Sequence, residues 1–115
     1  MQANDPWADR RSEVREPTNY RGRVFYGADL AVWADCTIRN MSPKGAMLEV
    51  ASMHPLPKSF VVMNIQDGHA LEVSLKWRRS DMAGVRITGR SSLEQAATER
   101  LAGLKTIWQG LKGQA

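Results

Sequence analysis

The residues best suited to binding chemistry near the start of this chain are three arginines, Arg10, Arg11 and Arg15, in a short polar stretch. A guanidinium group presents a planar fork of donors that matches phosphate oxygens and the O6/N7 edge of guanine. The cluster is therefore suited to recognising an anion. Its alternative interpretation is a group of solvated charges on a polar arm.

A second set of polar groups occupies the stretch from Asn40 to Gly45, between two apolar, β-prone runs. Ser42, Pro43 and Gly45 stand where a type I turn prefers serine, proline and glycine, and the serine hydroxyl can bond the local backbone. Asn40 can both donate and accept hydrogen bonds, and Gly45 lets the backbone approach a ligand closely. The stretch predicts a hairpin corner that holds polar groups toward a ligand.

The sequence offers no residue pattern that indicates a catalytic or metal-binding site. His54 and His69 have no ligand-like spacing to Cys36, so we expect no metal site. No nucleophile with a nearby base can be assembled, and no glycine-rich phosphate loop precedes a helix. We therefore expect a binding protein without a cofactor and not an enzyme.

Length and composition predict one small domain. The chain has 115 residues and a formal net charge of +4, with 11 arginines against 5 lysines. Its single cysteine, Cys36, excludes an internal disulfide and is most simply a small core residue in a reducing compartment. There is no run of 18 apolar residues and no signal-like segment in the first 30, so we expect a cytoplasmic protein without membrane insertion.

Period-two alternation of apolar residues predicts a mainly β fold, a small antiparallel barrel. In the longest run, Leu71, Val73, Leu75 and Trp77 are expected to face the core. The turn at residues 66–68 places Gly68 where a positive φ is needed. The expected strands are residues 21–26, 32–39, 46–50, 60–65, 71–78 and 84–87.

The tail changes to a helical period. Ser91 with Glu94, and Ser92 with Gln95, fit the capping-box spacing at a helix start. Leu93, Ala97, Leu101, Leu104, Trp108 and Leu111 then form an apolar stripe. Two roles are open for this helix, since it could plug the barrel, or part of its roughly 30 Å length could contact a partner or a second copy in a homodimer.

Two motifs in this order resemble the signature of the PilZ domain family. Arg11 and Arg15 form Arg-x-x-x-Arg, and the residues from Asn40 to Gly45 form Asn-x-Ser-x-x-Gly. The later segments "WR" at 77–78 and "GVRI" at 84–87 also resemble the family's strands. The resemblance implies a six-stranded antiparallel β-barrel with a C-terminal helix. We expect a flexible arm at 1–18, the barrel at 19–90 and the helix at 91–115.

The resemblance also implies a function, namely binding of the bacterial second messenger cyclic di-GMP. The implied ligand contacts are Arg10, Arg11, Arg15, Asn40, Ser42 and Gly45, with Arg78 as a further contact. The family implies a sensor or adaptor whose arm folds over the ligand and changes contact with a protein effector, in motility, surface attachment or exopolysaccharide control. An arginine at Arg10, before the motif, implies an intercalated ligand dimer.

Two other functions stay open. The positive charge and exposed aromatic residues would allow a small nucleic-acid-binding barrel. Acidic neighbours such as Glu13, Glu16 and Asp35 argue against it, and we expect no nucleic-acid partner. The second is a ligand-free protein-interaction module of the same fold. Trp7, the one large aromatic of the arm, is expected first to staple the arm to the barrel.

Overall fold

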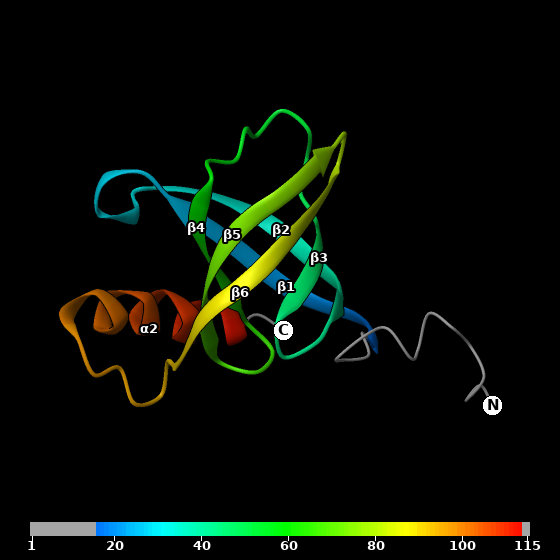
Figure 1. Ribbon diagram of the computed structural model, residues 1–115. Coiled ribbons are helices and arrows are strands. Elements are labelled where there is room, and N and C mark those ends of the chain that lie inside the picture. The colour runs from blue at the N-terminus through cyan, green and yellow to red at the C-terminus, as the bar shows by residue number, and fades with distance from the viewer. Residues whose placement is uncertain (1–15, 114–115) are drawn as a thin grey trace.

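Six antiparallel strands close into a barrel in the computed structural model, which describes residues 16–113 (Figure 1). The order around the barrel is β1-β2-β3-β6-β5-β4. The bounds are β1 Glu16–Tyr26, the 3₁₀ turn η2 Ala28–Leu30, β2 Val32–Met41, β3 Gly45–Glu49, β4 Ser59–Asn64, β5 His69–Arg79, β6 Met82–Ser92 and the helix α2 Glu99–Lys112. The predicted mainly β barrel with a C-terminal helix is confirmed.

The inside of the barrel is filled by the apolar residues that alternate along each strand. Val24, Ile38, Leu48 and Val62 are fully buried there, as are the expected inward residues of β3. Because side chains on a strand point alternately to its two faces, their sequence neighbours project outward. The outer faces therefore decide where the helix packs and where a ligand can bind.

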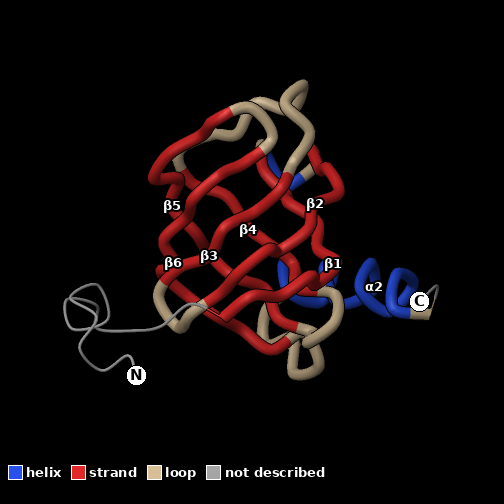
Figure 2. The backbone as a smooth tube through the Cα atoms, turned by 90° about the vertical axis from the view of Figure 1, so that its right-hand side faces the viewer, coloured by secondary structure: helices blue, strands red, loops and turns tan. Residues whose placement is uncertain are grey.

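α2 packs on the outer wall of the barrel, so the predicted plug is wrong (Figure 2). Leu104 and Trp108 lie in a second core with Phe25, Val61 and Met63, the outward residues of β1 and β4. These strands carry apolar residues on both faces, which creates an outer surface that the helix must cover. Leu93, Leu104 and Trp108 of the predicted stripe are buried in this second core, and the half-buried Leu101 and Leu111 pack against it. A homodimer through α2 stays a prediction.

The helix begins later than its sequence suggested. Ser91 and Ser92 pair with Ala70 and His69 in the β5–β6 ladder, and Thr98 provides the N-cap, its hydroxyl accepting from the backbone N–H of Leu101 at 3.1 Å. Strand pairing satisfies the backbone of residues 91–92, so the capping spacing there is not used. The barrel also starts earlier than expected, at Glu16.

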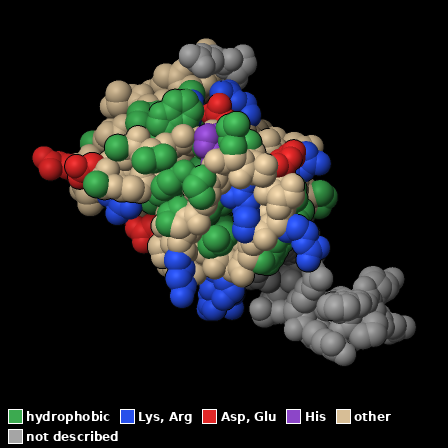
Figure 3. All heavy atoms as spheres, turned by 90° about the horizontal axis from the view of Figure 1, so that it is seen from above, with side chains coloured by type: hydrophobic (Ala, Val, Ile, Leu, Met, Phe, Trp, Pro, Cys, Tyr) green, Lys and Arg blue, Asp and Glu red, His purple; other side chains and the backbone are tan. Residues whose placement is uncertain are grey.

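The segment of residues 50–58, here called the β3–β4 loop, crosses one end of the barrel. β3 and β4 lie opposite each other in the strand order, so their connection must pass over the barrel mouth. Leu56 packs against the inner core from this loop. Figure 3 looks onto this end, where apolar side chains gather and Lys and Arg side chains lie toward the rim. The mouth is thus covered by chain at this end.

Candidate ligand-binding site

The turn between β2 and β3 is held by its own serine. The Ser42 hydroxyl accepts a hydrogen bond from the Gly45 backbone N–H at 3.1 Å and donates to the Gly45 carbonyl at 3.3 Å. The Ser42 backbone N–H also donates to that carbonyl, at 2.8 Å. Both residues are buried. The hydroxyl therefore bonds the local backbone, as predicted, and the turn is fixed before any ligand arrives.

Asn40 carries the unusual polar group of this region. A register shift between Ile38 and Asn40 leaves one extra residue in β2, and Asn40 then pairs with Met47 on the outer face of β3. The Asn40 Oδ1 atom is buried, and it has no hydrogen-bond partner among the residues that the structure describes. An unsatisfied buried acceptor costs about 1–3 kcal/mol. Such a group calls for a donor from outside the described barrel.

The start of β1 lies directly beside this turn. Glu16 pairs with Met41 and Pro17 pairs with Asn40, and the Thr18 hydroxyl donates to the Ile38 carbonyl. Arg15 immediately precedes Glu16 in the sequence. Arg10, Arg11 and Arg15, with Trp7 and the rest of the predicted arm up to residue 15, lie outside the described residues. The structure therefore shows where the arginine segment joins the barrel, next to Asn40.

Trp77 was predicted to face the core, and this prediction is wrong. A register shift between Leu75 and Trp77 turns the side chain outward, where it is 44% exposed. The indole lies over Gly84, because a Cβ at Gly84 would be 2.1 Å from the Trp77 Nε1 atom. Because Gly84 has no side chain, the large Trp77 ring can pack against the outside of the barrel at this position.

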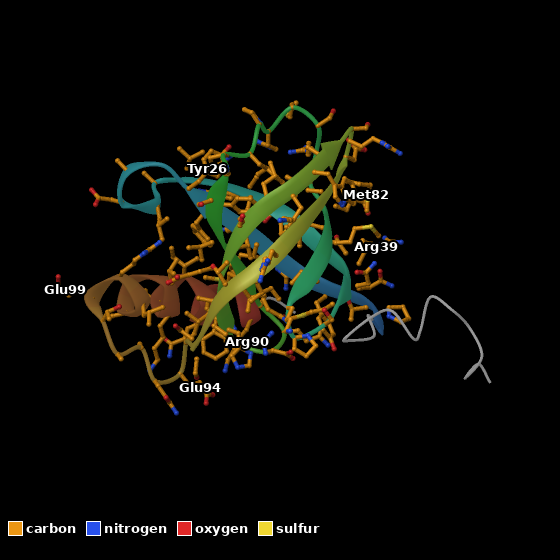
Figure 4. The ribbon with its side chains drawn as sticks, viewed as in Figure 1. Tyr26, Arg39, Met82, Arg90, Glu94 and Glu99 are labelled. Atoms are coloured by element: carbon orange, nitrogen blue, oxygen red, sulfur yellow. The ribbon has the colours of Figure 1, made fainter. Side chains whose placement is uncertain are left out.

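Trp77 and Asn40 lie on one row across the outer face. Asn40 pairs with Met47, Met47 with Gly84, and Gly84 with Trp77, and directly paired residues share a face of the sheet. Three strand spacings make this row roughly 14 Å long. Figure 4 places Arg39 and Met82, both from this part of the barrel, on the side away from α2. An exposed aromatic surface thus lies on the same face as the unsatisfied amide.

Two free cations flank the turn. Arg86 pairs with Gly45 across β3 and β6, and the neighbouring Ile87 backbone N–H donates to the Lys44 carbonyl at 2.8 Å. Both Arg86 and Lys44 are exposed, and within residues 16–113 neither forms an ion pair. Arg39, by contrast, bonds Glu49 at 3.2 Å. Sequence reasoning missed Arg86 and Trp77, although the "GVRI" and "WR" segments contain them.

Arg78 has a different position from the other predicted contacts. Its guanidinium donates to the carbonyls of Val50, Ala51, His54 and Ser80, all at 2.9–3.0 Å. These bonds tie the β3–β4 loop to the β5–β6 hairpin. Since Arg78 pairs with Ala83, opposite the far end of β3 from Gly45, the structure does not bring it to the turn. The guanidinium therefore anchors the loop in this structure, and the ligand contact expected of Arg78 stays a prediction.

Neither the Cys36 thiol nor a group of metal-ligating side chains offers reactive chemistry in residues 16–113. Burial, with a smaller contribution from the nearby Asp35 carboxylate, raises the pKa of the Cys36 thiol from 9.0 to about 12, so the thiol is neutral at physiological pH. Among residues 16–113 no three His, Cys, Asp or Glu side chains are placed to hold a metal ion. What the site offers is recognition: an amide acceptor, free cations and a flat ring.

A model of the PilZ domain family matches residues 9–102. The match covers most of the chain, and it includes both the arginine segment and the Asn40 turn. The chain therefore belongs to the PilZ domain family. PilZ domains are cyclic di-GMP-binding adaptor domains rather than enzymes.

No curated protein matches the chain. In the part of the chain described by the structure, no helix is long and apolar enough to span a membrane.

Proposed function

We propose that this protein binds cyclic di-GMP on the outer face of the barrel at the Asn40 turn. Arg10, Arg11 and Arg15 supply forked donors for the phosphates or the guanine edges. Asn40, Ser42 and Gly45 form the fixed half of the site. Arg86 and Lys44 add positive charge beside it, and Trp77 offers a surface on which a base can stack.

The observation that carries the proposal is the buried, unpartnered Oδ1 atom of Asn40. It lies beside the strand that Arg15 precedes and next to a turn already fixed by Ser42. A guanine N–H group can donate to this oxygen and so remove the cost of leaving it unsatisfied. The family supports the identity of the ligand, because cyclic di-GMP supplies both guanine edges and phosphates.

Calorimetry with cyclic di-GMP tests the proposal directly. We expect saturable binding, tighter than binding of GTP, a linear dinucleotide or single-stranded RNA, because the site matches a compact ligand with two phosphates. Equal or tighter RNA binding with the steep salt dependence of counterion release would instead support a nucleic-acid-binding barrel. Heat signals that do not saturate with any nucleotide would support a ligand-free interaction module.

Arginine variants separate binding from charge. Arg11→Ala and Arg15→Ala should each lose charge-assisted bonds worth roughly 1.5–3 kcal/mol, which weakens binding about ten- to a hundredfold. Arg100→Ala is the matched control, since Arg100 is exposed on α2, away from the Asn40 row. Wild-type affinity in both variants would mean that Arg11 and Arg15 are solvated charges that do not contact the ligand. That result would contradict the proposal.

Binding also gives the protein a route to act as a cytoplasmic adaptor. Ligand contacts at Arg11 and Arg15 would draw the segment before β1 over the Asn40 turn and change the surface that a protein effector meets. Tryptic cleavage between Arg10 and Arg21 should slow at saturating ligand. Cleavage at an unchanged rate would contradict this switch. Motility, surface attachment and exopolysaccharide control are the processes that the family suggests for the effector.

A further inference from the structure

A groove runs between α2 and the η2 turn, on the side of the molecule away from the Asn40 row. It has a volume of about 690 Å³, and Leu30, Leu104 and Ile107 give it an apolar floor. A second hollow of about 410 Å³ continues over the outer wall of β4 and β5. The two share Gly27, Leu30 and Arg100 as lining residues, so they form one continuous groove.

The side of α2 that faces this groove has no side chain at its middle position. Glu99, Gly103 and Ile107 are four residues apart and therefore lie along one side of α2. A Cβ at Gly103 would meet nothing within 4 Å, and Ile107 is 38% exposed. Since a glycine in a helix costs about 1 kcal/mol relative to alanine, its presence here is not explained by the helix itself. It permits the backbone of another segment to approach α2 closely.

The rim of the groove is acidic although the protein as a whole is basic. Asp29, Glu72 and Glu99 contribute carboxylates, and Arg100 contributes the single guanidinium. None of these four side chains forms an ion pair with the rest of residues 16–113. Figure 4 shows Tyr26 at the barrel wall and Glu99 at the outer end of α2, on the two sides of the groove. Its charge is thus complementary to a cationic partner.

We propose that this groove docks a basic amphipathic helix of a partner protein. An apolar floor with a charged rim is the usual build of a protein interface, and complementary charge selects the partner. A helix fits better than an added strand, because the barrel described here is closed and offers no free edge for β-addition. The gap at Gly103 allows the close interaxial distance at which helices pack.

The docking proposal rests on different residues from the cyclic di-GMP proposal. β1 joins the two regions, with its first residues beside Asn40 and Gly27, which lines the groove, just beyond its other end. Eleven extended residues span roughly 36 Å. A helix at the α2 end of the groove would therefore leave the Asn40 turn uncovered, whereas the second hollow reaches Ser74, the cross-strand partner of Arg86. The Gly103 and Arg11 variants test the two proposals separately.

Two synthetic peptides test the docking of a basic helix. Each has about 14 residues, the length of α2, with leucine at i, i+3, i+4 and i+7; one carries lysine on its polar face and the other carries glutamate. We expect the lysine peptide to bind saturably and to weaken as the salt concentration rises from about 50 to 300 mM. Amide NMR shifts should be largest at Gly27, Leu30, Gly103 and Ile107. The glutamate peptide should bind at least about tenfold more weakly.

Two glycine variants of the same helix locate the site. Gly103→Leu fills the groove and should weaken the lysine peptide by about tenfold or more, a loss of about 1.4 kcal/mol. Gly110→Leu is the control, because Gly110 also has open space around it but does not line the groove. Both changes raise helix propensity, so both proteins should fold. The double variant Asp29→Asn with Glu99→Gln should remove most of the salt dependence.

Three results would overturn the proposal. The lysine peptide binding no better than the glutamate peptide would remove the charge selection. Equal affinity of the Gly103→Leu and Gly110→Leu variants would place any binding elsewhere. A wild-type dimer in sedimentation that Gly103→Leu abolishes would assign the groove to a second copy of this chain instead of a partner.

Discussion

Asn40 is the residue at which stability and binding are expected to conflict. In the described barrel its Oδ1 atom is buried without a partner, whereas a functional site often holds such a group ready for a ligand. Its neighbour in the motif, Ser42, is by contrast bonded to the turn on both sides. We therefore expect Asn40 to contact the ligand, while the described bonds of Ser42 hold the turn in place.

We predict that Asn40→Ala leaves the free energy of unfolding unchanged or raises it by up to about 1 kcal/mol, because it removes an unsatisfied acceptor. The same variant should bind cyclic di-GMP about tenfold more weakly or worse. Denaturant unfolding and calorimetry measure the two effects.

Asn64→Ala is the control. Asn64 is fully buried and bonds Asp67 through both ends of its amide, at 3.1 and 3.3 Å. It should lose about 1–3 kcal/mol of stability. A comparable loss in Asn40→Ala would mean that the Asn40 amide is satisfied within the free protein.

Cys36 gives a prediction about pH. Its pKa is raised from 9.0 to about 12 in the folded protein, so between these values the unfolded chain loses its thiol proton and the native state keeps it. The unfolded state then binds fewer protons, and the Cys36 contribution makes stability fall as pH rises from about 9 to 12. Cys36→Ala should show a shallower decline in urea unfolding over this range. Parallel declines would contradict the burial of the thiol.

At the scale of elements, two roles can be distinguished for Arg78, as an anchor of the β3–β4 loop and as a ligand contact. Its four bonds to backbone carbonyls hold the β3–β4 loop across the barrel mouth. We predict that Arg78→Ala lowers the free energy of unfolding by about 2–3 kcal/mol, because bonds from a charged donor are strong and the carbonyls lose their partner. Arg78→Lys should recover little, since an ammonium cannot replace the fork.

Affinity for cyclic di-GMP in these Arg78 variants is the second measurement. It should stay within about twofold of wild type, because the guanidinium is already engaged far from the Asn40 turn. Arg79→Ala, its exposed neighbour, should change stability by no more than about 0.5 kcal/mol. Strong loss of affinity with unchanged stability would restore Arg78 as a ligand contact.

The elements also show what sequence alone could predict. Alternating apolar residues predicted the strands and their inward faces, because that pattern depends only on the strand itself. Bulges before Asn40 and Trp77 could not be predicted, since an extra residue is defined relative to the partner strand. The same holds for Arg78, whose carbonyl partners come from a loop about 25 residues away. The turn at Ser42 was predictable because its described bonds, all to Gly45, are local.

At the scale of the whole molecule, the protein has two surfaces on opposite regions of one barrel. The outer face of β2, β3, β6 and β5 carries Asn40, Arg86 and Trp77, and the outer wall of β1 and β4 carries α2. The Asn40 turn and the α2 end of the proposed docking groove thus lie apart, and the two proposed surfaces approach each other at Arg86 and Ser74. An adaptor needs this separation, because it must hold its ligand while a partner is bound.

The number of ligands in the nucleotide site is the last prediction, and it rests on Arg10. Two intercalated cyclic di-GMP molecules concentrate four phosphate charges, and a third guanidinium offsets part of their repulsion. Arg86 and the Trp77 ring lie on the outer face beyond the Asn40 turn, so the surface proposed for binding continues along the row. We expect two ligands per chain at saturation in native mass spectrometry and calorimetry. Arg10→Leu should saturate at one, while Arg100→Leu, the matched control on α2, should still take two. A wild-type chain that saturates at one ligand refutes the prediction, whatever the Arg10 variant does.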